Sequence, residues 1–421
     1  MAHPYIRLLR DRDVRVLWGG LTLSAVGSEL YGLGAIWLAV SLAGAEGSYL
    51  ATARFAAVLV MSLGAGAFVD LVSRRVLLIG SDLVRAAFSA VVVVAALAEG
   101  LTLLVLILAS AVLAAFGALF QPALQSGLPR LFPDSARLRE TNGLFDATAR
   151  MAQVAGPFLA AALASVLPVI HLLSLNALSF LASAGAIARL GVRLEGAKDD
   201  GPRPTIRRRL ARGVHAANVC AGAWRVLLTT TVRAGAVTLG FGVGIPLFFA
   251  ERAETGLGGI VAVAVVLGAA AASELLSNLA VVLVQPRNPW RFMFSGYAAI
   301  GAGLALIALA QSLPPSLLQV LLMAAPACLI GVGNSMAGIQ MLTFFGSRLG
   351  ADDFAGVLRL RLVLVTGAAI VSTAFGPVLF EAFGIPGTVL ACGLLSLAAA
   401  MIGVLSREND RAEALAGDPP R

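Results

Sequence analysis

Charged side chains are scarce in this sequence of 421 residues. Asp, Glu, Lys and Arg together make up 13% and aromatic residues 7%, whereas 59% of the residues are hydrophobic. This apolar content, with a mean hydropathy of +0.90, exceeds what a water-soluble core requires and indicates that lipid is the solvent. The 45 glycines favour helices that approach one another closely, as membrane helices do. We therefore expect an all-α integral membrane protein.

Cysteine and histidine are also rare, which limits the chemistry. None of the three cysteines lies in a C-x-x-C spacing, so neither a disulfide framework nor a metal site is predicted. The three histidines show no paired ligand spacing, and the sequence has no Walker or nucleophile-elbow motif. We therefore predict no enzyme activity, no cofactor and no metal. The residues concerned are Cys220, Cys328, Cys392, His3, His171 and His215.

Long apolar runs are abundant. Twelve are long enough to cross about 30 Å of hydrocarbon, six on each side of a polar central segment. The first run is too long for a secretory signal and lacks a convincing cleavage site, so we interpret it as a retained helix. The predicted spans are 15–43, 49–70, 76–98, 101–128, 142–167, 169–190, 223–250, 257–284, 291–311, 315–346, 355–383 and 385–405.

Arginine is distributed unevenly between the loops. Because short cytoplasmic loops retain positive charge, both termini and the central segment are predicted to lie in the cytoplasm, with the protein in the cell inner membrane. Arg54 and Arg252 are exceptions near outward ends. The stretch RPTIRRRLARG fits anionic lipid headgroups better than nucleic acid, which would require a soluble basic domain. The predicted cytoplasmic arginines are Arg7, Arg10, Arg12, Arg15, Arg74, Arg75, Arg130, Arg137, Arg139, Arg203, Arg207, Arg208, Arg209 and Arg212.

The two halves of the chain resemble each other, as expected after duplication. VRVLWGGLTLSAVGSELYGLG aligns without gaps to WRVLLTTTVRAGAVTLGFGVG, which places Gly32 and Gly34 opposite Gly242 and Gly244. A second match is Gly-Pro in span five and again at 376–377 in span eleven. We predict an N-terminal six-helix bundle (1–193), a cytoplasmic linker (194–222), a C-terminal six-helix bundle (223–406) and a cytoplasmic tail (407–421).

The loop between spans two and three contains GAFVDLVSRR. With twelve spans in two halves, its G-x-x-x-D-x-x-x-R-R pattern resembles the major facilitator superfamily over essentially the whole chain, although Leu71 and Ser73 depart from the motif. The resemblance implies a conformational switch formed by Gly66, Asp70, Arg74 and Arg75. It also implies that the aspartate braces the two halves by meeting the N-terminus of helix eleven, after the potential caps Asp352 and Asp353. The alternative is a loop whose charges only set topology.

Two further stretches resemble the drug and siderophore exporter branch of this superfamily, of the enterobactin-exporter type. They are LFQPALQSGLPRLFPDSARLRETNGLF and ARMAQVAGPFLAA. In the second, Gly156 and Pro157 resemble the core of the antiporter motif, and a Gly-Pro pair allows a helix to kink and pack closely. The resemblance implies export by antiport. The arginine that some members use for proton coupling in helix four is absent here, so coupling would depend on other residues.

Ionisable residues inside the spans are costly and mark functional candidates. Counted from the cytoplasmic ends, Glu29 lies about 21 Å, Glu274 about 15 Å and Arg233 about 12 Å deep, so Arg233 could reach Glu274 or approach Glu29. Tyr31 and Asn278, on the same spans as the two glutamates, complete the predicted cavity. The alternative for each glutamate is a structural role. We interpret two further sets of close charges, Asp146 with Arg150 and Asp82 with Arg85, as structural pairs.

These features predict a secondary active transporter that exports small amphiphilic molecules by proton antiport, with alternating access. Apolar cavity walls with few charges are expected. Proton-coupled uptake and lysolipid transport are alternatives, and a non-transporting membrane receptor is an alternative of a different class. The expected partners are a small-molecule substrate, protons and membrane lipid, and the expected state is a monomer. The sequence does not specify the substrate.

Overall fold

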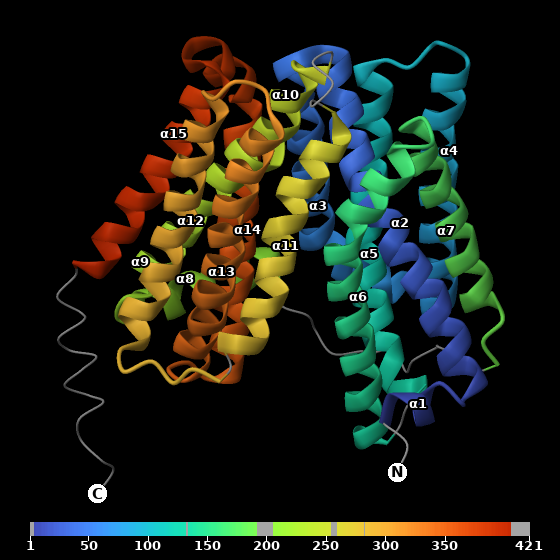
Figure 1. The fold of residues 1–421 in the computed structure, drawn as a ribbon. Coiled ribbons are helices and arrows are strands. Elements are labelled where there is room, and N and C mark those ends of the chain that lie inside the picture. Colours follow the sequence, from blue (N-terminus) through green and yellow to red (C-terminus); the bar gives the residue numbers. More distant parts are fainter. Residues whose placement is uncertain (1–3, 132–133, 192–204, 254–258, 282, 406–421) are drawn as a thin grey trace, which may run out of the picture. The chain divides into compact units, whose positions relative to one another are not determined.

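Every regular element in the described part of this computed structural model is a helix. The description covers residues 4–131, 134–191, 205–253, 259–281 and 283–405. The chain forms two compact units, unit 1 (residues 1–202) and unit 2 (residues 203–421). Each unit has its own set of long helices (Figure 1).

Three helices of unit 1, α2, α4 and α6, begin with side-chain caps. Asp11 accepts hydrogen bonds from the N–H groups of Asp13 (3.0 Å) and Val14 (3.4 Å), and Asp134 accepts one from Ala136 (3.0 Å). Such caps pair N–H groups that the helix itself leaves free. The elements are α1 (Pro4–Leu8), α2 (Arg12–Ala43), η1 (Gly44–Gly47), α3 (Ser48–Leu71), α4 (Arg74–Leu97), α5 (Leu103–Leu131), α6 (Ser135–Ala164) and α7 (Ile170–Ala188).

Unit 2 contains one span built from three consecutive segments. Helix α9 passes into the π-helical segment η2, where the helical turn is wider, and then into α10. The elements are α8 (Ile206–Val219), α9 (Ala223–Ala236), η2 (Val237–Val243), α10 (Gly244–Ala250), α11 (Ile260–Val281), α12 (Pro289–Gln311), α13 (Leu317–Gly346), α14 (Ala351–Ala374) and α15 (Gly376–Val404).

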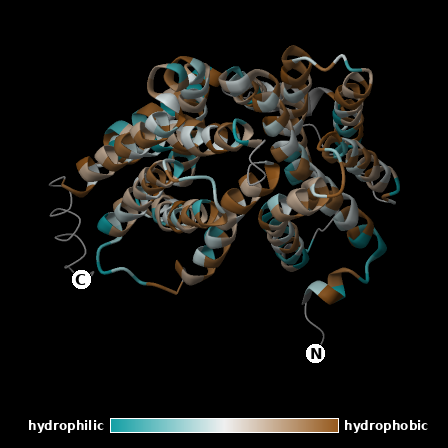
Figure 2. Ribbon diagram, turned by 45° about the horizontal axis from the view of Figure 1, so that its top comes forward, coloured by the Kyte–Doolittle hydropathy of each residue, from teal (hydrophilic) through white to brown (hydrophobic). Residues whose placement is uncertain are grey.

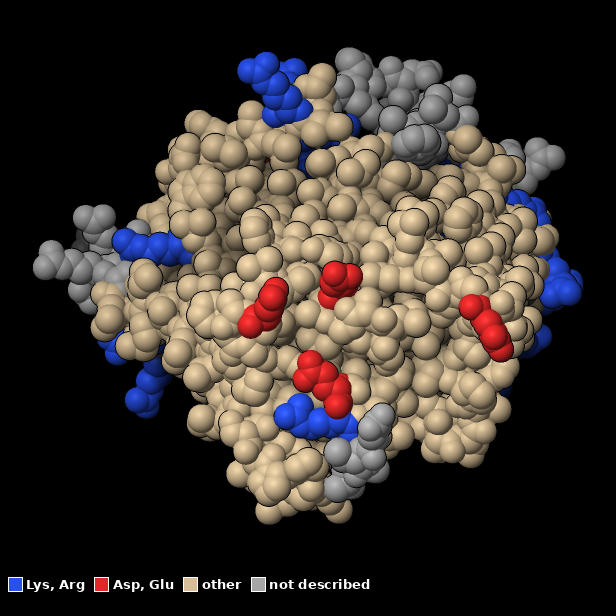
Figure 3. Space-filling model, turned by 90° about the horizontal axis from the view of Figure 1, so that it is seen from above, with Lys and Arg blue, Asp and Glu red and all other residues tan. Residues whose placement is uncertain are grey.

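The long helices have the length and composition of membrane spans. Ten described segments meet these criteria, and one of them, Arg12–Gly64, contains α2 and most of α3. Helix α6 is not among them, because its sequence carries more polar and charged residues. Figure 2 shows apolar residues along the helices and hydrophilic residues mainly at helix ends and connections. Seen from the top of Figure 1, the surface carries few acidic or basic side chains (Figure 3).

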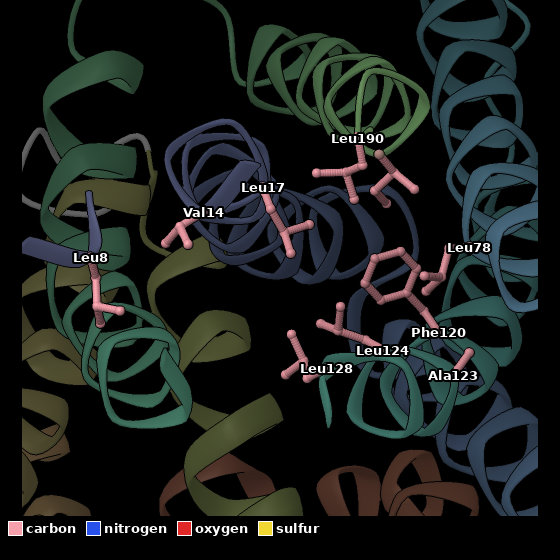
Figure 4. Packing of buried hydrophobic residues seen from close by; sticks show 10 residues of the cluster. Leu8, Val14, Leu17, Leu78, Phe120, Ala123, Leu124, Leu128 and Leu190 are labelled. Atoms are coloured by element: carbon pink, nitrogen blue, oxygen red, sulfur yellow. The ribbon is translucent and has the colours of Figure 1, made fainter. Parts of the chain in front are cut away.

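A glycine seam holds α2 against α7. Gly20, Gly27 and Gly34 follow one another at intervals of seven residues, and a methyl group on Gly20 would lie 2.6 Å from the Ala186 Cβ. A methyl group on Gly34 would lie 2.9 Å from Leu173. At the end of unit 1 that carries α1, a cluster of apolar side chains from α2, α4, α5 and the end of α7 fills the interior (Figure 4). Small residues thus permit the close approach that membrane helices need.

The internal repeat has a counterpart in the packing. Gly34 contacts Leu173 on α7, the last span of unit 1, and Gly244 contacts Val389 on α15, the last span of unit 2. These two glycines are opposite each other in the sequence alignment of the halves. Gly240 also packs closely, against Cys392, which explains GFGVG as a packing stretch.

Predicted span eleven, 355–383, is interrupted at Phe375. Helix α14 ends at Ala374, and a new helix begins at Gly376, with Pro377 in its first turn, where a missing N–H group costs nothing. The chain turns again at Gly384, which has a positive φ of 66°. Gly384 lies at the boundary predicted between spans eleven and twelve. The Gly-Pro pair at 376–377 therefore lies within predicted span eleven, directly after the break at Phe375, whereas the pair at 156–157 lies inside α6.

The predicted linker contains a helix, α8. Its small residues Gly213, Ala216 and Ala217 are buried, and its arginines lie on the outer side, so a polar and turn-rich sequence still folds as an amphipathic helix. A methyl group on Gly213 would lie 2.9 Å from the backbone carbonyl carbon of Gly356, so α8 packs directly on α14.

The predicted caps of span eleven are first-turn residues instead. The N-cap of α14 is Gly350, and no side chain caps this helix end. Asp352 and Asp353 lie in the first turn, where their negative charge suits the positive end of the helix dipole. Asp352 accepts a hydrogen bond of 3.1 Å from Arg212 on α8.

Candidate functional site

A cavity of about 750 Å³ opens in unit 1 between α2, α4, α5 and α6. Eleven of its nineteen lining residues have polar side chains, so the walls of this unit 1 cavity are largely polar, and the expectation of apolar walls around a central cavity stays a prediction. The apolar wall includes Trp18, Phe120 and Phe145, which gives the cavity an aromatic part beside a polar one. The polar lining residues are Thr22, Ser24, Ser28, Glu29, Arg85, Gln121, Gln125, Asn142, Asp146, Thr148 and Gln153.

Glu29 lines this cavity from α2 and is half-buried. It packs against Gly156 on α6, because a methyl group on Gly156 would overlap the Glu29 Cβ and lie 3.0 Å from its Cγ. Pro157 follows directly, and its missing N–H group leaves the carbonyl of residue 153 without its usual helical partner. The structure therefore brings the predicted carboxyl group and the antiporter-like Gly-Pro pair into contact.

Arg54, on α3, is a basic neighbour of Glu29 that the sequence pattern did not indicate. No basic residue lies at helical contact spacing from Glu29 on α2 itself, but the charge of Arg54 acts on it from the neighbouring helix. Spacing along one helix cannot identify such a neighbour. Glu29 is therefore not electrostatically isolated.

Arg85 and Asp82 form a buried ion pair on α4, which confirms their structural pairing. The Arg85 guanidinium also lies over two aromatic rings, 4.7 Å from the centroid of Phe120 and 4.3 Å from that of Phe180. Such stacking stabilises a cation in an apolar setting. Because Arg85 also lines the cavity, it has a second potential role that the pairing alone did not predict.

Two polar contacts lie on the side of the cavity that α6 forms. Asp146 pairs with Arg150 at 2.8 Å, as predicted, and the Asp146 side chain also lines the cavity. Trp18 Nε1 donates a hydrogen bond of 2.9 Å to Thr148 Oγ1, which joins α2 to α6. These helices therefore present a defined wall of polar groups.

In unit 2, Arg233 and Glu274 are joined through an intermediate residue. Arg233 Nη1 donates a 2.6 Å hydrogen bond to Asn334 Oδ1, and Asn334 Nδ2 donates a 3.2 Å hydrogen bond to Glu274 Oε2. Ser335 donates a further bond of 2.9 Å to the Glu274 carbonyl. The predicted direct pair is therefore a three-residue relay across α9, α13 and α11. The predicted approach of Arg233 to Glu29 stays a prediction.

Two more residues of unit 2 belong to this cluster. Tyr297 on α12 shares a 2.7 Å hydrogen bond with Thr230 on α9, and Arg361 on α14 lies close enough for its charge to act on Arg233. Nε of Arg233 and Nε of Arg361 are buried without a hydrogen-bond partner among the described residues. Arg361 lies inside a predicted span, so the rule that identified Arg233 would also have found it.

The two other predicted cavity residues, Tyr31 and Asn278, do not line the unit 1 cavity. The Tyr31 hydroxyl is buried in a 2.7 Å hydrogen bond with Ser110 on α5, and Tyr31 does not line the unit 1 cavity. Asn278 is half-buried one turn after Glu274 on α11. Its role stays a prediction.

The switch motif spans the end of α3 and the start of α4. Gly66 and Asp70 belong to the last turns of α3, but the side chain of Asp70 lies outside the described part of the chain. Ser73 caps α4 by accepting a hydrogen bond from the Val76 N–H (3.3 Å), and Arg75 donates one to the Ala188 carbonyl at the end of α7. The motif departure at position 73 therefore supplies a helix cap.

Comparison with known proteins gives both a family and a fold. The family model described as Major Facilitator Superfamily matches residues 17–358. A mutant of the nucleoside transporter NupG has a TM-score of 0.74 at 13% identity, with 92% of this chain and 99% of that chain covered. A bacterial homologue of the iron transporter ferroportin, inward-facing, has a TM-score of 0.69 at 16% identity, with 94% and 99% covered.

A third similar structure is a bacterial homologue of the human lysosomal transporter Spinster. It has a TM-score of 0.68 at 14% identity, and 100% of both chains is covered. No curated protein sequence matches this one significantly. At such low identities these structures show a shared fold.

Proposed function

The chain belongs to the Major Facilitator Superfamily, and from this premise we propose that it exports small amphiphilic molecules in exchange for protons. Membership makes it a multi-pass membrane protein and a secondary transporter, in a family that is typically non-enzymatic. Export, antiport and the substrate class are the proposal, as are a monomeric state, the inner membrane and cytoplasmic termini. The resemblance of Gly156 and Pro157 to the antiporter motif supports antiport.

The observation that carries the proposal is the position of Glu29. It lines a cavity whose walls are partly aromatic and partly polar, and it touches Gly156 beside Pro157. A substrate with an apolar or aromatic part and several hydrogen-bonding groups is complementary to such walls. A carboxyl group in this position can hold either a proton or a cationic group of the substrate, which is the exchange that antiport requires.

The contact with Gly156 suggests how exchange is coupled to motion. Any change in the charge of Glu29 occurs where α6 approaches most closely and where Pro157 interrupts its hydrogen bonding. In alternating access, the substrate site is open to one side of the membrane at a time. We place the coupling between protonation and that movement at the α2–α6 contact.

The test compares Glu29→Gln with Glu274→Gln in liposomes and in inside-out vesicles, with ethidium and an uncharged amphiphilic dye as probes. Glutamine fixes a neutral side chain, so Glu29→Gln should retain dye exchange and lose accumulation driven by a pH gradient. Glu274→Gln should retain both, because Asn334 and Arg233 already engage that carboxylate. Full gradient-driven accumulation in both variants would refute a carboxyl carrier.

The same vesicles address the alternatives. Accumulation in inside-out vesicles with an acidic interior indicates export, whereas accumulation only in right-side-out vesicles with an acidic exterior indicates proton-coupled uptake. Lysolipid transport would appear with a fluorescent lysolipid in place of the dye. Binding without counterflow of any probe would favour a receptor.

A further inference from the structure

A second cavity, of about 230 Å³, lies at one end of unit 2, where α13 ends and α12 begins. This is the lower end of the unit in Figure 1. Trp290 and Phe344 form an aromatic floor, with ring centroids 5.5 Å apart, and Arg287 and Arg348 lie at the exposed edge. The cavity is separate from the Arg233 relay and from the cavity of unit 1.

Several donors that line the pocket are already used in hydrogen bonds within the protein, and the two arginines supply the cationic donors that remain for a ligand. Trp290 Nε1 already donates to the Gly403 carbonyl (2.9 Å). The hydroxyls of Thr343 and Ser347 donate to carbonyls of their own helix, at 3.0 and 3.3 Å. The donors that remain include the side-chain amide of Gln340 and the two guanidinium groups, which are the cationic donors that line the pocket among the described residues. No acidic residue lines the pocket among the described residues.

The guanidinium groups of Arg287 and Arg348 can bind an anion. Arg348 Cζ lies 4.1 Å from the centroid of the Phe344 ring, which fixes the plane of the guanidinium and leaves its N–H edge open. Within the described chain, neither the Arg287 nor the Arg348 guanidinium makes a hydrogen bond or ion pair. A planar guanidinium binds phosphate oxygens in pairs, so a phosphate ester is the complementary ligand.

The position of the pocket indicates where that phosphate comes from. Helices α12 and α13 are both membrane spans, so their ends lie at the level of the lipid headgroups. Leu342, next to the pocket on α13, is 46% exposed and continues the apolar surface that acyl chains cover. Basic pockets between span ends are typical of anionic lipid recognition. We propose that this pocket binds the phosphate headgroup of an anionic phospholipid.

The experiment titrates the purified full-length protein with phosphatidylglycerol and records bound lipid by native mass spectrometry. The test variant is Arg287→Gln with Arg348→Gln. Its matched control is Arg139→Gln with Arg189→Gln in unit 1, which removes the same charge from two exposed arginines outside the pocket and outside the stretch RPTIRRRLARG. Phosphatidylglycerol should bind about thirtyfold more weakly to the test variant and unchanged to the control.

Further arms identify the ligand. Phosphatidylcholine should bind the unsubstituted protein weakly. Arg287→Lys with Arg348→Lys retains both charges but loses the planar guanidinium groups, so its affinity for phosphatidylglycerol should lie between those of the unsubstituted protein and the glutamine variant. Equal phosphatidylglycerol affinity in the test and control variants would overturn the proposal. Glycerol 3-phosphate that binds without lipid and displaces phosphatidylglycerol would retain the phosphate chemistry but overturn the lipid as its source. None of these outcomes depends on the proposed export activity.

Discussion

Glu29 and Gly156 are far apart in the sequence and in direct contact in unit 1. The absence of a side chain at 156 is what gives the Glu29 methylene groups room. We therefore predict that Gly156→Ala destabilises unit 1 by about 1–3 kcal/mol, as overpacking does, and slows transport. Thermal unfolding in detergent measures this loss.

A complementary exchange is the control for that contact. Glu29→Gly on α2 makes room for the methyl group that Gly156→Ala adds on α6. The double variant should therefore recover most of the melting temperature that Gly156→Ala loses, but it should not recover proton coupling. If Gly156→Ala unfolds at the temperature of the unsubstituted protein, α6 does not depend on this contact.

Asn334 is neutral, but it stands between two charged groups. Its amide accepts from Arg233 and donates to Glu274, so Asn334→Ala would leave both groups without these bonds. We predict a loss of about 1–3 kcal/mol, the typical cost of leaving buried polar groups unsatisfied. Asn278→Ala, one turn from Glu274, is the control and should cost much less. Equal melting temperatures for the two variants would show that the relay adds no stability.

At the scale of the element, α8 depends on its backbone approach to α14. Gly213→Ala places a methyl group against Gly356, so we predict that α8 separates from α14 and becomes accessible to protease and to hydrogen exchange. Arg212→Ala removes only the exposed pair with Asp352 and should cost less than about 1 kcal/mol. Equal protection of α8 in the two variants would contradict this order.

The sequence predicted the membrane-spanning helices best, because each must be long enough to cross the hydrocarbon layer. Starts and ends of most long helices lie near the predicted spans, because an apolar run must cover the hydrocarbon thickness. The break at Phe375 was not predicted because hydropathy is continuous through Ala374 and Gly376, and only backbone geometry interrupts the helix there. The predicted boundary between spans eleven and twelve coincides with the non-helical residue Gly384. The amphipathic helix α8 was missed because short, polar helices give little hydropathy signal.

Site residues were predictable where charge interrupts an apolar span. Glu29, Arg233 and Glu274 gave that signal, and Arg361 gives it as well. Asn334 was not selected, because a neutral amide in an apolar run costs less to bury than a charge and Asn334, unlike Asn278, lies on a span without a predicted ionisable site residue. The polar walls of the unit 1 cavity were not predicted, because they combine single residues from four helices whose facing sides are set by packing.

At the scale of the whole molecule, the switch motif makes a prediction about populations. If Asp70 braces the outward-facing state, Asp70→Asn should shift the protein toward the inward-facing state without loss of folding. Labelling of single cysteines from the two sides of the membrane measures this shift. Glu140→Gln, which neutralises another carboxylate on the predicted cytoplasmic side, is the control. An unchanged labelling pattern with normal transport would reduce the motif to a determinant of topology.

The π-helical segment η2 has a consequence for how this chain can change by insertion and deletion. A wider turn accommodates one residue more than an α-helix of the same length. Loss of a single codon within 237–243 could therefore be absorbed by conversion to regular α-helix, whereas elsewhere in a span it would rotate everything beyond it by about 100°. Span seven can therefore lose one residue within Val237–Val243 and still cross the membrane with the helix beyond it in its original orientation.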